Sequence, residues 1–152
     1  LTGEYNEDLG IKDVTWVNAD GNEMQIEQWI DNGMKCFGMV MDGRAQATGI
    51  RQRGQDATLL LALNAHHDVV DFHLPEVAGG IGWRCIIDTN SPLSEVQGET
   101  LNFNDSYMAV GRSLLLFELA GHDSYQTARS ASGQSFSKLT ERKSGASLKE
   151  IK

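Results

Sequence analysis

The sequence predicts an all-β fold, an antiparallel β-sandwich in which two sheets pack face to face. Short apolar runs separated by turn residues recur at intervals of roughly ten residues from Met34 onward, which is typical of sandwiches and barrels. Several runs alternate apolar and polar residues, as strands with one buried face do. No stretch keeps a helical period long enough to predict a long helix.

Residues 1–33 are expected to form a connector ahead of the sandwich. A short alternating run ends near Val17, and the Asp20-Gly21 pair that follows favours a tight turn. The next stretch, MQIEQWIDN, supports one or two helical turns at most. Nothing in this segment predicts a core element.

Residues 34–121 contain the predicted strands of the sandwich. The run KCFGMVMD ends at an Asp42-Gly43 turn, and ATLLLALNA is continuously apolar, as expected of a strand covered on both faces. Later runs alternate, and their apolar positions are expected to face the core. These positions are Val70, Phe72 and Leu74, then Trp83, Cys85 and Ile87, then Leu101 and Phe103. The stretch SYMAVGRSLLLFEL predicts a short strand, a turn and a last apolar strand.

Residues 122–152 form a compositional unit of their own. They hold 6 Lys/Arg against 3 Asp/Glu, whereas residues 1–121 hold 7 against 18. This Ser- and Lys-rich tail has too few apolar residues to build a core, so we expect it to be loosely ordered.

Composition and charge exclude several classes of function. The net charge of -8 argues against nucleic acid as a partner, because such binding needs clustered Lys and Arg. No apolar run is long enough to span a bilayer and no signal segment opens the sequence, so we expect no membrane partner and a cytoplasmic location. The absence of a P-loop or dinucleotide fingerprint predicts no cofactor. Since the first residue is Leu1 rather than Met, we expect a piece of a longer protein.

Cys36 and Cys85 both lie in apolar stretches. A buried thiol behaves as a small hydrophobe, so we expect reduced core residues, with a disulfide as the less favoured alternative.

The stretch NAHHD raises the question of a metal or catalytic site. His66, His67 and Asp68 are consecutive, and adjacent side chains on an extended strand point to opposite faces. Zinc needs three or four converging ligands, so no metal-binding residue is predicted and the stretch is expected to be the polar end of a hairpin. Ser113 lacks the G-x-S-x-G elbow of a hydrolase, and no catalytic residue is predicted.

Aromatic residues in the connector offer a different kind of site. Trp16 and Trp29 lie near several carboxylates, including Asp20, and an apolar ring beside hydrogen-bonding groups suits a neutral sugar. We take these three residues as candidate glucan contacts. The favoured alternative is that both rings pack against a neighbouring domain, because exposed apolar patches usually mark interfaces.

Four segments resemble, in order, the C-terminal end of a bacterial glycogen debranching enzyme of the isoamylase type, in the α-amylase superfamily. They are IKDVTWVNADGNEMQIEQW, MDGRAQATGIRQRGQDATLLLALNAHHDVVDFHLP, GWRCIIDTNSP and YMAVGRSLLLFEL, within residues 10–119. The resemblance implies an N-terminal β domain, a (β/α)8 barrel that hydrolyses α-1,6 branch linkages, and a C-terminal β-sandwich. This chain would hold the connector from the barrel and the sandwich.

The same resemblance implies that the catalytic carboxylates belong to barrel motifs absent from this chain. His67-Asp68 mimics the end of one such motif, but a strand follows it at once where the barrel would have a helix. We therefore expect an accessory domain that is inactive alone, stabilises the barrel of the same polypeptide, and meets glycogen or maltooligosaccharides through the parent enzyme. The alternatives are an α-glucan-binding module and, with less support, a stand-alone interaction protein.

Overall fold

The structure, a computed structural model, describes residues 3, 5–6, 11–45, 57–92 and 99–121. The chain divides into two units, Leu1–Ala120 and Gly121–Lys152, and all but one of the described residues belong to the first. The predicted tail, residues 122–152, lies outside the described residues.

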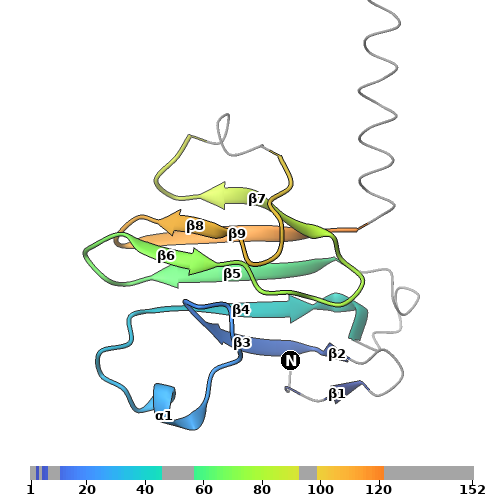
Figure 1. Cartoon of the computed structure of the whole chain (residues 1–152), viewed down its shortest axis with the longest axis horizontal. Coiled ribbons are helices and arrows are strands. Elements are labelled where there is room, and N and C mark those ends of the chain that lie inside the picture. The colour runs from blue at the N-terminus through green and yellow to red at the C-terminus, as the bar shows by residue number, and fades with distance from the viewer. Residues whose placement is uncertain (1–2, 4, 7–10, 46–56, 93–98, 122–152) are drawn as a thin grey trace, which may run out of the picture. The chain divides into compact units, whose positions relative to one another are not determined.

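A five-stranded antiparallel sheet forms the larger layer, with the strand order β3-β4-β5-β9-β7 (Figure 1). Its strands are β3 (Val14–Asn18), β4 (Cys36–Asp42), β5 (Thr58–Asn64), β7 (Gly82–Asp88) and β9 (Ser113–Ala120). Because β9 pairs with both β5 and β7, the last strand that the structure describes lies inside the sheet.

The second layer is a two-stranded antiparallel sheet, β6 (Val70–His73) with β8 (Ser106–Ala109). Phe72 of β6 is fully buried among residues of β4, β5 and β9. Gly38 of β4 makes room for this ring, because a Cβ there would lie 2.8 Å from Phe72 Cζ. The antiparallel all-β prediction is therefore confirmed, as is the inward orientation of Phe72 and Leu74.

The remaining described elements are short. They are the pair β1 (Tyr5–Asn6) and β2 (Ile11–Lys12), the one-turn helix α1 (Ile26–Trp29) and the 3-10 turn η1 (Gly43–Ala45). The helix agrees with the prediction of one or two helical turns. No helix among the described residues is both long and apolar enough to cross a membrane.

The structure corrects three expectations about strands. The run Val14–Asn18, placed in the connector, is the edge strand β3, and its Val17 belongs to the core. Ile87 is 38% exposed rather than inward, because a bulge between Cys85 and Ile87 shifts the register of β7 against β9. Leu101 forms a single bridge to Trp83 instead of a strand.

Trp83 anchors the core between the layers. Its side chain is fully buried, and its indole Nε1 donates a 2.7 Å hydrogen bond to the carbonyl of Pro75. The indole therefore ties the segment after β6 to β7 while filling the largest single volume in the core.

Both cysteines are free and buried, as predicted. Burial raises the pKa of the Cys36 thiol to about 11, because a thiolate is poorly solvated in the core. In the unfolded chain the thiol loses its proton near its ordinary value, so between the two values the folded state holds the extra proton. Stability therefore falls as the pH rises through this window.

We predict that urea denaturation will show a loss of about 1–2 kcal/mol of stability between pH 8.5 and pH 10.5 that depends on Cys36. Cys36→Ala removes the titrating group, so its stability should decline less over the same range. An equal decline in the two proteins would show that the Cys36 thiol does not cause the loss of stability.

Candidate functional site

The five-stranded sheet has a second face that the β6–β8 layer does not cover. One row of paired residues crosses this face from β3 to β9: Trp16, Met39, Leu61 and Leu116. Neighbouring rows add Phe37, Met41, Leu59, Leu63 and Leu114. We call these nine residues the outer face. All nine are apolar, eight are half-buried and Trp16 is exposed, so this part of the sheet presents a broad apolar surface, with Asn18 and Glu118 at the ends of the same rows.

The outer face changes the interpretation of ATLLLALNA. The run was predicted to be covered on both faces, yet along β5 buried residues alternate with half-buried ones. Between Thr58 and Asn64 the side chains on both sides of the strand are apolar, although only Leu60 and Ala62 reach the core. Apolar residues on both sides of this strand were the sequence signal for a second contact surface, the outer face.

Trp16 and Trp29 come together beside the outer face. Their ring centroids lie 5.4 Å apart at an interplanar angle of 81°, and Trp16 also contacts Phe37. The two tryptophans border a shallow groove that also contains Lys12 and Glu23, which are joined by an ion pair. At the two ends of α1, its first residue Ile26 and its C-cap residue Ile30 are more than three-quarters exposed, so apolar surface continues beyond the sheet.

Asp20, the third candidate glucan contact, borders a different groove. That groove, with a volume of about 510 Å³, is lined by Asp20 and Asp31 on one part of the chain and by His66 and Asp68 on another. The structure thus groups the two tryptophans and places Asp20 with the histidine stretch. Glucan contact at these residues stays a prediction.

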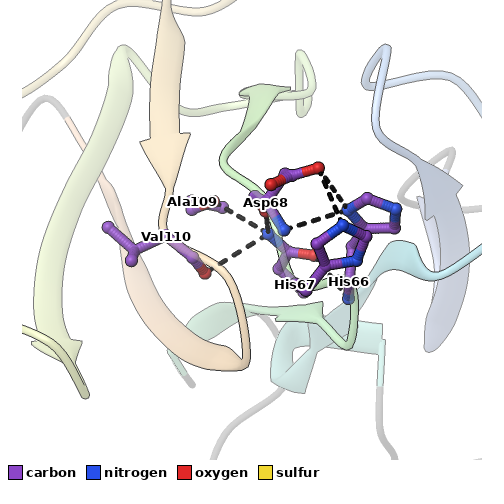
Figure 2. Close-up of polar contacts among 6 residues, drawn as sticks. His66, His67, Asp68, Ala109 and Val110 are labelled. Carbon is purple, nitrogen blue, oxygen red and sulfur yellow. Dashed lines mark hydrogen bonds and ion pairs between the residues drawn. The ribbon is translucent and has the colours of Figure 1, made fainter.

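The histidine stretch is a turn between two sheets and not the end of a hairpin. β5 belongs to the five-stranded sheet and β6 to the two-stranded sheet, so the expected hairpin is wrong. The expectation that the adjacent side chains diverge is also wrong, because the backbone bends here. The rings of His66 and His67 stack with centroids 4.2 Å apart, and His67 Nε2 lies 3.1 Å from Asp68 Oδ2 (Figure 2).

The buried side chain of Asn64 holds this turn in place. Its Nδ2 donates to the carbonyls of Asp68, Ala109 and Val110 at 2.9, 2.9 and 3.2 Å (Figure 2). Its Oδ1 accepts from the backbone N–H of His66 at 2.9 Å. One amide therefore fastens the β5–β6 connection to the segment that leaves β8.

Several further buried polar groups hold parts of the fold together. The Asp42 carboxylate is 2% exposed and accepts hydrogen bonds from Arg44 and Thr58, and its hydrogen bond to Arg44 raises the pKa of that guanidinium. Burial raises the pKa of Tyr107, whose hydroxyl donates to Asp88. Ser113 Oγ donates to the carbonyl of Val110 at 2.6 Å, so its hydroxyl is engaged as a turn constraint.

Comparison with known proteins gives the family of this fold. The family described as "Isoamylase, C-terminal" matches residues 13–118, which takes in every strand from β3 to β8 and most of β9. The chain belongs to the isoamylase C-terminal domain family. The match begins just before β3, in agreement with the place of that strand in the sheet.

The isoamylase C-terminal domain is also similar to much longer proteins. Relatives called "Glycogen operon protein GlgX homolog" in Mycobacterium bovis (strain ATCC BAA-935 / AF2122/97) and in two strains of Mycobacterium tuberculosis, CDC 1551 / Oshkosh and ATCC 25618 / H37Rv, are 30% identical over 109 residues. The alignment covers 70% of this chain and 15% of each relative. The chain thus corresponds to a small part of those proteins.

Proposed function

We propose that this chain is the C-terminal accessory domain of a glycogen debranching enzyme, and that its outer face packs against the catalytic barrel of the same polypeptide. The parent would hydrolyse α-1,6 branch linkages in glycogen or limit dextrins by a retaining mechanism with two carboxylates. The observation that carries the proposal is the broad apolar outer face. A broad apolar surface that no second layer of the described structure covers is typical of an interface.

The length of the relatives supports this choice of occupant for the outer face. Relatives of this domain are several times longer than the match, so another part of the same polypeptide is available to cover the sheet. The exposed Trp29, Ile26 and Ile30 adjoin the outer face through the contact between Trp29 and Trp16, and they extend the surface that a neighbouring domain could bury. Burial of this surface is favourable because it removes apolar area from water.

Binding of an α-glucan at Trp16 and Trp29 has less support. In their edge-to-face arrangement, the edge of one ring covers a face of the other. That contact removes one of the ring faces on which a sugar could stack.

The test compares the polypeptide encoded by the complete gene with the 152-residue chain, by measuring reducing ends released from a branched limit dextrin. We expect activity in the former and none in the latter. In the longer polypeptide, Leu61→Lys should lower activity by about tenfold or more, because an unpaired ammonium would be buried in the interface.

Met108→Lys is the matched control, because Met108 is 69% exposed on β8 and away from the outer face. It should leave activity unchanged. A thermal melt of the isolated chain should show Leu61→Lys still folded. A gene without a barrel, or full activity in the Leu61→Lys protein, would refute the proposal.

A further inference from the structure

We propose that His66, His67 and Asp68 form a binding site for a divalent transition-metal ion of the Zn²⁺ type. One ligand atom from each residue can be chosen such that all three lie within 4.8 Å of one another. Imidazole nitrogens with a carboxylate oxygen are a donor set that suits Zn²⁺, Ni²⁺ and Cu²⁺. This inference is independent of the proposed function.

The geometry of the three side chains is convergent. His67 Nε2 lies 3.1 Å and His66 Nδ1 lies 3.8 Å from Asp68 Oδ2, and Figure 2 shows both rings on the same side of the turn as the carboxylate. His67 and Asp68 have more than 60% of their side-chain surface exposed. An ion could therefore reach the three ligands directly and keep water in its remaining positions, as in sites with three protein ligands.

The backbone under the site is already fixed. Asn64 binds both ends of the turn, and the backbone N–H of Arg112 donates to the carbonyl of His66 at 2.9 Å. The backbone of Gly111 lies close to the turn, since a Cβ there would lie 2.3 Å from the carbonyl oxygen of His67. Because these contacts order the turn before any ion arrives, binding costs little conformational entropy.

The surroundings of the site favour a cation. His66 and Asp68 line the same groove as Asp20 and Asp31, and Lys35 is the one cationic residue among the described residues that line it. Three carboxylates thus face one groove in a chain of net charge -8. Their combined field attracts a divalent ion and raises its local concentration.

One existing hydrogen bond sets a limit on affinity. The backbone N–H of Asp68 donates to His66 Nδ1 at 3.0 Å, so an ion at that nitrogen must replace it. We therefore expect micromolar affinity rather than the tighter binding of a closed structural site.

The test is calorimetric titration of the untagged chain with ZnCl₂, together with amide chemical shifts measured by NMR. We expect one ion per chain, with shifts concentrated at residues 64–70. His67→Ala should weaken binding at least tenfold, and Asp68→Asn should weaken it as well. His73→Ala is the control, because His73 lies on β6 outside the cluster and should leave the affinity unchanged.

The His67→Ala protein should melt like the parent in the absence of metal, because the ring is exposed and its polar contact is with the side chain of Asp68. No binding by the parent at millimolar Zn²⁺ would overturn the proposal. Equal affinity in the parent and in the His67→Ala protein would also overturn it, since the ion would then be held elsewhere.

Discussion

Asn64→Asp is expected to lower the free energy of unfolding by about 3–5 kcal/mol at pH 7, although the two side chains have nearly the same shape. The amide nitrogen that donates to three carbonyls becomes an oxygen that faces them. Three acceptors lose their donor, and a negative charge enters a position that is 2% exposed. The penalty should shrink near pH 4, where the new carboxyl is protonated and can donate one hydrogen bond.

Urea denaturation followed by fluorescence measures this change. Asn22→Asp is the matched control, because it makes the same chemical substitution at an exposed position. It should alter stability by less than about 0.5 kcal/mol. Similar losses in the two variants would show that the bonds of Asn64 are not what holds the β5–β6 connection.

Trp83→Ala is expected to cost about 4 kcal/mol, through lost apolar contact and the cavity that the indole leaves. The side chain is fully buried, and its hydrogen bond to Pro75 would also be lost. Such a loss is a large fraction of the stability of an ordinary domain, so the midpoint of urea denaturation should fall steeply.

Two further tryptophan variants test how much of this loss of stability comes from the buried volume of the indole and how much from its hydrogen bond. Trp83→Phe keeps most of the apolar volume but leaves the Pro75 carbonyl without its donor, so we expect an intermediate loss. Trp29→Ala should cost far less, because Trp29 is 52% exposed in this chain. A loss for Trp29→Ala as large as that for Trp83→Ala would show that the indole of Trp83 does not dominate the core.

Sequence reasoning predicted the strands well wherever one face is apolar and the pairing is regular. Phe72 and Leu74 follow a simple alternation, and both are fully buried. Ile87 follows the same alternation, but the prediction that it faces the core was wrong, because a bulge depends on the partner strand. The pairing of Ile87 with Leu116, which shifts the register, involves a residue far along the chain that local pattern cannot supply.

The convergence of the histidine stretch was not predictable for a related reason. Whether His66 and His67 diverge or stack depends on the path of the backbone, and that path is fixed by Asn64. The partners of Asn64 include the carbonyls of Ala109 and Val110, which lie 45 and 46 residues further along the sequence. The sequence did contain a signal for the outer face, because ATLLLALNA has apolar residues on both sides of the strand. We interpreted that pattern as burial on both sides and so did not predict the second surface.

The position of β9 has a consequence for how the protein is made. β9 is the last described strand to leave the ribosome, yet β5 and β7 are joined in the sheet only through it. Until Ala120 has been synthesised, one edge of β5 and one edge of β7 that β9 will cover stay unpaired, and such edges are sites for pairing with other chains. Closing them requires contacts of long sequence separation, which are slow to form. The nascent domain therefore depends on β9 for protection from aggregation during translation.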